Sequence, residues 1–119
     1  MISDGDFPKE EHLLKTGDFR KVYKNGSAHK RDPLFLYRLP NAGETIRVGF
    51  SVSSRSIKLA TRRNRIKRLL REAYRLNKAK LKKGFDIVIV VRRDPSPALA
   101  YKDIEKKFLG VAGEAGILK

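Results

Sequence analysis

The stretch from Phe85 to Val91 constrains the fold of this chain more than any other part of its sequence. It reads Phe-Asp-Ile-Val-Ile-Val-Val, so every position except Asp86 is apolar. A strand with an almost unbroken apolar run is typical of a sheet position that is covered on both faces. The chain must therefore supply packing layers for both sides of this strand. Gly84 separates the strand from the segment before it.

Hydrophobic periodicity predicts helices and further strands around it, with a period of about 3.6 residues in helices and two in strands. Thr16 or Asp18 can cap a first helix, and Asn25-Gly26 ends it. The predicted elements before Gly84 are a helix near 16–25, strands at 34–37 and 45–52, and a helix at 58–77. We expect the two strands to pair as an antiparallel hairpin across a turn at 40–43.

Both ends of the chain are expected to be loose. Residues 1–12 form a polar lead-in, and a last helix that begins near Tyr101 gives way to glycine-rich sequence from Gly110, with a flexible tail at 112–119. The chain is then expected to form a single domain over residues 1–119 with the element order α-β-β-α-β-α. This order predicts an α+β sandwich around a small mixed sheet, in which a strand–helix–strand crossover lays two strands parallel.

The charge of the chain indicates its partner. Lys and Arg number 28 and Asp and Glu 13, which leaves a formal net charge of +15. Such a charge destabilises the compact state through self-repulsion, which a polyanion would offset. Nucleic acid is the first candidate for that polyanion. The alternative is a basic protein that is merely soluble, but here the charges are clustered rather than scattered.

The sequence also lacks features that other classes of protein need. It has no cysteine, which excludes a disulfide framework and a cysteine-based zinc site. No apolar run approaches the ~18 residues of a membrane span, so we expect no membrane partner. The first residues, Met-Ile-Ser-Asp-Gly-Asp, do not have the basic and apolar regions of a secretory signal. The chain is therefore expected in the cytoplasm.

The segment from Arg62 to Arg75 carries the strongest functional signal, because it is dominated by basic residues. At about 100° per residue, its apolar side chains form a core stripe with the residue before it: Leu59, Ile66, Leu70 and Ala73, flanked by Leu69 and Tyr74. A second row, which we call the cation row, lies away from the core: Asn64, Lys67, Arg68, Arg71 and Arg75. Arg62 and Arg63 lie near the apolar side, at the start of the helix, where they can reach past the end of the sheet.

Three interpretations compete for the cation row. A solvated helix face normally mixes Glu with Lys at i, i+4, and Glu72 alone does not balance the row. A membrane-surface or calmodulin-target helix needs a free apolar stripe, whereas this stripe is needed to cover the sheet. Contact with RNA fits best, because arginine makes bidentate contacts with phosphates and base edges.

Aromatic side chains supply a second candidate surface: Phe19, Tyr23, Tyr37 and Phe50. Single-stranded RNA is typically held by rings that stack on splayed bases, with cations nearby. Phe19 and Tyr23 share one helix face, and if this face meets the open side of the sheet they line a groove with Tyr37. The alternative is ordinary core packing, which for Phe50 carries at least equal weight.

Two motifs resemble the protein component of bacterial ribonuclease P. One is Gly49-Phe50-Ser51-Val52-Ser53, and the other runs Arg-Asn-Arg-Ile-Lys-Arg-Leu-Leu-Arg-Glu-Ala-Tyr-Arg over 63–75. The resemblance extends to 18–23 with Gly26, to Leu36-Tyr37 and to 86–90, so it covers the chain from about Leu14 to Pro95. The chain departs from the family over 54–59, Ser-Arg-Ser-Ile-Lys-Leu, where a glycine is usual and none is present.

The resemblance implies a sandwich with a left-handed strand–helix–strand crossover, against the usual right-handed rule. It also implies a monomeric subunit that joins ribonuclease P RNA one to one and promotes endonucleolytic removal of the 5′ leader of precursor tRNA. The RNA would hold the catalytic Mg²⁺. The residues expected to contact that RNA are Arg63, Asn64, Arg65, Lys67, Arg68 and Arg71, with Arg62 and Arg75 beside them. The residues expected to line a leader cleft are Phe19, Tyr23 and Tyr37, with Phe50 as a further candidate.

The protein itself is expected to be non-catalytic. A stand-alone nuclease would need a carboxylate cluster for a metal or a general acid and base pair. His12 and His29 have no spacing that suggests cooperation, and the carboxylates are scattered. A generic RNA-binding or ribosome-associated protein stays open as an alternative, since it shares the charge but does not require the helix motif and the aromatic groove together.

Overall fold

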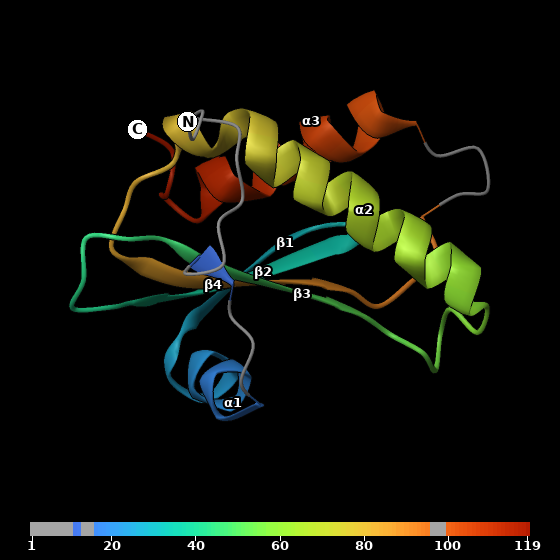
Figure 1. Ribbon diagram of the computed structural model, residues 1–119, viewed down its shortest axis with the longest axis horizontal. Helices are drawn as coiled ribbons and strands as arrows, with labels where there is room; N and C mark the ends of the chain where they lie inside the picture. The colour runs from blue at the N-terminus through green and yellow to red at the C-terminus, as the bar shows by residue number, and fades with distance from the viewer. Residues whose placement is uncertain (1–10, 13–15, 96–99) are drawn as a thin grey trace.

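The computed structural model of the protein describes residues 11–12, 16–95 and 100–119. A four-stranded mixed sheet forms its centre, with the strand order β1-β2-β4-β3 (Figure 1). The strands are β1 (Ser27–Arg31), β2 (Leu34–Pro40), β3 (Arg47–Val52) and β4 (Phe85–Val91). β4 is antiparallel to β2 and parallel to β3. The chain connects β3 to β4 through a helix, so the predicted crossover with parallel strands is confirmed.

Helices cover both faces of the sheet. α1 (Thr16–Asn25) lies on one face, while α2 (Ala60–Asn77) and α3 (Tyr101–Glu114) lie on the other, with the short 3-10 helix η2 (Lys78–Lys80) after α2 (Figure 1). Side chains of β4 alternate between the two layers. Those in the main core with α2 and α3 are Ile87, Ile89 and Val91, and those that pack with Val22 of α1 are Val88 and Val90. The predicted burial of this strand on both faces is confirmed.

The predicted hairpin between β2 and β3 is wrong, because β4 lies between these two strands. The hairpin instead joins β2 to β1, with Ala28 opposite Tyr37. β1 could not be predicted from periodicity, because Ser-Ala-His-Lys-Arg has no alternation of apolar and polar residues. β4 takes the inner position because its apolar side chains need packing partners above and below, and both helical layers reach the middle of the sheet.

The predicted flexible tail at 112–119 is also wrong. α3 continues through Gly110 and Gly113 to Glu114, and Gly116, at φ 72°, follows its end. Ala112, Ala115 and Ile117 are buried in the main core, and Leu118 forms a β-bridge with Leu81. A glycine inside a helix costs about 1 kcal/mol relative to alanine. Burial of these apolar side chains outweighs that penalty, which is why the helix does not stop at Gly110.

The predicted loose lead-in falls mostly on residues 1–10, which lie outside the described residues. Its last two residues are held in place. Tyr74 donates its hydroxyl to Glu11 Oε1 at 2.8 Å, and Lys78 Nζ lies 3.2 Å from the same oxygen. His12 forms a parallel bridge with Val48 on the outer edge of β3. Burial and the acceptor Glu11 together raise the pKa of Tyr74 far above its usual range.

Replacement of Ile117 by alanine tests whether the C-terminal segment belongs to the core. The side chain is fully buried, so Ile117→Ala is expected to lower the free energy of unfolding by about 2–5 kcal/mol. Urea denaturation measures this loss. Leu76→Ala is the control, because Leu76 is 51% exposed and its truncation should change stability by about 0.5 kcal/mol. Equal small losses for both variants would contradict the packed tail.

Candidate nucleic-acid-binding surfaces

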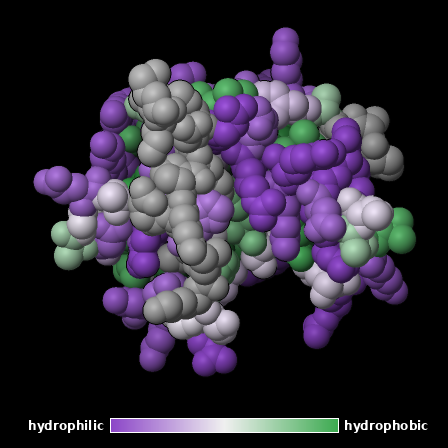
Figure 2. Space-filling model, in the orientation of Figure 1, coloured by the Kyte–Doolittle hydropathy of each residue, from purple (hydrophilic) through white to green (hydrophobic). Residues whose placement is uncertain are grey.

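The core stripe of α2 fixes the direction in which the cation row points. Ile66, Leu70 and Ala73 are fully buried against the sheet and α3, and so is Tyr74. Asn64, Arg65, Arg68 and Arg71 are exposed, while Lys67 and Arg75 are half-buried. Hydrophilic side chains accordingly gather over α2 on the molecular surface (Figure 2). The separation of an apolar stripe from a row of cations, inferred from helical spacing, is confirmed.

Leu59 is the exception to the predicted stripe. It precedes the first residue of α2 and is 70% exposed, so its assignment to the core is wrong. Ile57 takes its place, with 3% exposure. The reason is that the chain turns before the helix begins: the amide of Ile57 donates to the carbonyl of Ser53 at 2.9 Å. Helical spacing cannot be extrapolated through such a turn.

The basic side chains at the start of α2 are engaged with neighbouring backbone and carboxylate oxygens. Arg63 Nη1 donates to the carbonyl oxygens of Ile57 and Lys58 at 2.7 and 2.9 Å. Arg62 forms a forked pair with Asp94, with Nη2 2.8 Å and Nε 3.1 Å from Oδ1. The segment 54–59 therefore reaches the helix without a glycine, and all its residues have negative φ.

These contacts divide the predicted RNA-facing set. Arg63 is engaged with the turn and Arg62 with Asp94, and Arg75 pairs with Glu72 one helical turn away. Within the described part of the chain, Lys67, Arg68 and Arg71 make no ion pair. Those three cations, with Asn64 beside them, form the most available part of the cation row. Arg65 is exposed on the same helix.

The opposite face of the sheet carries the predicted aromatic side chains. Val22 buries α1 against Val88 and Val90, and Phe19 and Tyr37 pack at the margin of this cluster. The Tyr23 and Tyr37 rings meet edge to face, with centroids 5.0 Å apart and planes at 82°. Tyr23 remains 39% exposed. The structure therefore brings Phe19, Tyr23 and Tyr37 together, as predicted from the spacing on α1.

Gly49 allows α1 to approach the sheet this closely. A Cβ atom at this position would lie 2.5 Å from Cζ of Phe19, inside the closest normal contact. The absence of a side chain on this face of β3 leaves room for the Phe19 ring. The glycine in the Gly49-Phe50-Ser51 motif is therefore a packing requirement of the aromatic face.

Phe50 does not belong to the aromatic face. Side chains alternate along β3, so Gly49 and Ser51 point toward α1 while Val48, Phe50 and Val52 point toward α2 and α3. Phe50 packs half-buried against the main core. Its assignment to the leader cleft is therefore wrong, and the core-packing alternative is correct. The sequence could have indicated this, since Val48 and Val52 mark the core face of the same strand.

Two residues of the aromatic face were missed. Phe35 shares a face of β2 with Tyr37, and Arg92 follows the end of β4. The guanidinium carbon of Arg92 lies 4.7 Å from the Phe35 ring centroid and 5.8 Å from that of Tyr37, and Nη2 donates to the Tyr37 hydroxyl at 2.8 Å. The two-residue alternation along β2 could have indicated Phe35. Nothing in the local sequence marks Arg92, because its place depends on the pairing of β2 with β4.

A groove of about 540 Å³ runs beside these rings. It is lined by Tyr23, Ser51, Val52, Ser53, Ser54, Arg55, Ser56, Val90 and Arg92. Burial raises the pKa of Tyr23 above its usual value and Tyr37 adds to the effect, while a hydrogen bond with Ser51 and the charge of Arg92 oppose it. The Tyr23 hydroxyl therefore stays protonated at neutral pH. This aromatic groove combines the Tyr23 ring, serine hydroxyl groups and two arginines, with the Tyr37 ring next to Tyr23.

No described residues form a group of three or more His, Cys, Asp or Glu side chains that could hold a metal ion. His12 and His29 lie on different strand edges, since His12 bridges β3 while His29 belongs to β1. In the described ranges, no helix is both long and apolar enough to cross a bilayer.

A cation row on one layer and an aromatic groove on the other are typical of a sandwich protein that binds RNA.

The family model for Ribonuclease P matches residues 7–116. The ribonuclease P protein component of Clostridioides difficile (strain 630) is 46% identical over 102 residues, which are 85% of this chain and 88% of that protein. The component of Alkaliphilus oremlandii (strain OhILAs) is 45% identical over 97 residues, 82% and 83% of the two chains.

Solved structures agree with the family match. The RNase P protein of Staphylococcus aureus superposes with a TM-score of 0.81 at 26% identity, over 92% of this chain and 98% of that one. The RNase P protein of Thermotoga maritima superposes with a TM-score of 0.80 at 30% identity, over 87% and 96%. The chain therefore belongs to the ribonuclease P protein family.

Proposed function

We propose that this chain is the protein subunit of a ribonuclease P holoenzyme, in which it binds the catalytic RNA through α2 and the 5′ leader of precursor tRNA through the aromatic groove. The observation that carries this proposal is the separation of the two surfaces. The cation row and the rings lie on opposite faces of one sheet, with β4 buried between them. One protein molecule can therefore contact two RNA segments at once. The proposal includes a monomeric protein in a 1:1 complex with the RNA.

The cation row suits the phosphates of a structured RNA. Lys67, Arg68 and Arg71 are close in space on one helix face, and within the described residues no carboxylate pairs with them. Their mutual repulsion destabilises the free protein. A phosphate backbone relieves that repulsion and releases the RNA's own counterions, which makes such binding strongly salt-dependent.

The aromatic groove suits a single strand. Bases without partners stack on exposed rings, and each stack contributes about 1–3 kcal/mol. Tyr23 and Tyr37 offer ring edges and faces, and Arg92 and Arg55 supply charge for the phosphates between the bases. The 5′ leader is the single-stranded part of a precursor tRNA, so it is the segment that matches this surface.

The proposed chemistry is endonucleolytic 5′ maturation of tRNA, with the Mg²⁺ ions held by the RNA. The described residues offer neither a carboxylate cluster nor a histidine pair for that chemistry. The role of the protein is then to bind and orient: α2 fixes the subunit on the RNA, and the groove holds the leader beside the cleavage site. The proposed place of action is the cytoplasm.

Reconstitution with a bacterial ribonuclease P RNA tests this function. The purified protein alone should cleave nothing, because the residues that the structure describes offer no carboxylate cluster for a metal. Added to the RNA at low magnesium, it should raise the rate of precursor-tRNA cleavage. A protein that cleaves in magnesium without RNA would instead be a nuclease in its own right. A protein that binds the RNA without any effect on cleavage would be a generic RNA-binding protein.

Charge removal at Arg68 tests the cation row. Arg68→Gln should flatten the dependence of log affinity on log salt by about 0.7–0.9, as expected for one lost phosphate contact. The thermal stability should stay within about 0.5 kcal/mol, because Arg68 is exposed. Arg62→Gln is the matched control, since Arg62 pairs with Asp94 and its loss should leave the slope closer to that of the wild type. An unchanged slope for Arg68→Gln would show that the row faces solvent.

Truncation of Tyr37 separates leader binding from core packing. Tyr37→Ala should weaken precursor tRNA binding by the holoenzyme by about 1–3 kcal/mol and scarcely change the affinity for mature tRNA, which has no leader. Phe50→Ala is the matched control, because its ring packs against the core on the other side of the sheet. That variant should lose folding stability and weaken both RNAs together. Equal losses for both tRNAs from a stably folded Tyr37→Ala protein would refute the leader assignment.

A further inference from the structure

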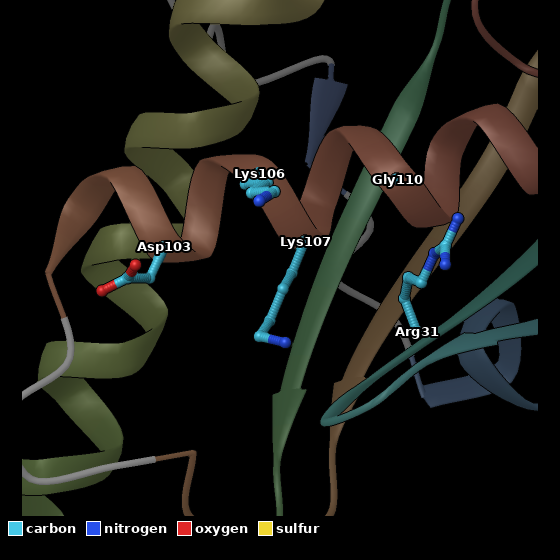
Figure 3. Close-up of a pocket in the computed structure, with 5 residues that line it drawn as sticks. All are labelled: Arg31, Asp103, Lys106, Lys107 and Gly110. Atoms are coloured by element: carbon cyan, nitrogen blue, oxygen red, sulfur yellow. The ribbon is translucent and has the colours of Figure 1, made fainter.

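A second cationic surface lies at the edge of the sheet opposite the cation row. Between α3 and the end of β1 the surface is hollowed, with a volume of about 540 Å³. The residues that line this β1–α3 hollow are Arg31, Asp103, Lys106, Lys107 and Gly110 (Figure 3). Neither the cation row nor the aromatic groove includes any of them.

The hollow is built by specific contacts. Gly110 leaves room for Arg31, because a Cβ atom there would lie 3.3 Å from Nε and 3.4 Å from Cγ of that side chain. Lys107 Nζ donates to the carbonyl oxygen of Asp32 at 2.9 Å, which ties α3 to the turn between β1 and β2. Arg31 and Lys107 are therefore placed by the fold, one from the strand and one from the helix.

The acidic groups nearby offset only part of the positive charge of the hollow, because among its lining residues Asp103 is the one acid beside Arg31, Lys106 and Lys107. Asp103 accepts a hydrogen bond from the amide of Ala100 at 3.3 Å, at the start of α3, and Asp32 pairs with Arg93. Glu114 pairs with Arg31 at 3.2 Å, but the two side chains are 42% and 55% exposed. Such a surface pair contributes at most about 1 kcal/mol, so a phosphate can displace the carboxylate.

Lys106 is the third positively charged residue of the hollow, beside Arg31 and Lys107. Its side chain is exposed at the hollow, and within the described residues it makes no hydrogen bond or ion pair. A phosphate in the hollow would thus meet one unpaired ammonium group and one weakly paired guanidinium group, with Lys107 beside them.

The hollow and the cation row lie toward opposite edges of the sheet. β1 and β3 are the two edges of the sheet, and strands are about 4.8 Å apart, so the edges are about 14 Å from each other. α2 packs over β3, whereas α3 packs over β1 and β2. This separation exceeds the screening length of about 8–10 Å at physiological salt. We therefore expect the phosphates at the two edges to belong to different positions of a bound RNA.

We propose that the β1–α3 hollow binds a backbone phosphate of the catalytic RNA, in a segment different from the one that contacts α2. This inference rests on the proposed function, since it takes ribonuclease P RNA as the partner. The protein then holds two segments of one RNA at fixed separation, in addition to the leader in the aromatic groove.

Charge removal in the hollow gives the first test. Lys106→Gln should weaken binding to ribonuclease P RNA on the order of tenfold, as for one charge-assisted hydrogen bond, and flatten the salt dependence by about 0.7–0.9. Lys102→Gln is the matched control, because it removes the same charge from the same helix outside the hollow. Thermal melts of both variants should match the wild type. Wild-type affinity and slope for Lys106→Gln would overturn the proposal.

Tethered cleavage gives the second test. The chain has no cysteine, so a single introduced cysteine can carry an iron chelate that cuts nearby RNA with hydroxyl radicals. Lys102→Cys places the chelate beside the hollow without altering its lining, and Leu76→Cys places it on α2 outside the cation row. Cuts in two different RNA segments support the proposal. Cuts from Leu76→Cys alone overturn it, and an acidic protein would then be the better candidate ligand of the hollow. Cuts from neither variant count against the proposed function itself.

Discussion

Burial of β4 on both faces is the constraint from which the rest of this structure follows. Val88 and Val90 need cover on one side, and Ile87, Ile89 and Val91 need it on the other. A chain of 119 residues can meet both needs with one sheet and a helical layer on each face. β4 therefore lies inside the sheet between β2 and β3, and the return from β3 to β4 has to run through α2.

This arrangement also separates the two candidate RNA surfaces. α2 uses Ile66, Leu70 and Ala73 to cover the main core, so its basic residues can only point outward. α1 covers the smaller cluster through Val22 and leaves Tyr23 and Tyr37 at its margin. The charge repulsion of the cation row is tolerated because the opposite stripe of the same helix is fully buried. The core and the candidate RNA surfaces thus lie on opposite sides of the same elements.

Contacts at the ends of elements then determine which basic residues are available. Arg63 holds the turn that precedes α2, Arg62 pairs with Asp94 after β4, and Lys107 ties α3 to the turn after β1. Basic residues that look alike in the sequence therefore differ in role. Those engaged with carbonyl or carboxylate oxygens shape the protein, and those such as Arg68 and Lys106 remain available for phosphates.

The sequence by itself determined the strand buried on both faces, the amphipathic division of α2 and the shared face of Phe19 and Tyr23, because each depends on the period of one local element. Only the tertiary structure decided which strands pair, and so which side chains meet. β1 joined the sheet without an apolar pattern, Phe50 fell on the core face, and Arg92 reached Tyr37 through the pairing of β2 with β4. Likewise, α3 continues beyond Gly110 because Ile117 and its neighbours are buried against residues that are distant in the sequence. The local sequence does not show this burial. A local sequence pattern predicts the helical or strand periodicity of one element. Strand register and long-range burial depend on contacts between elements, which only the folded chain has.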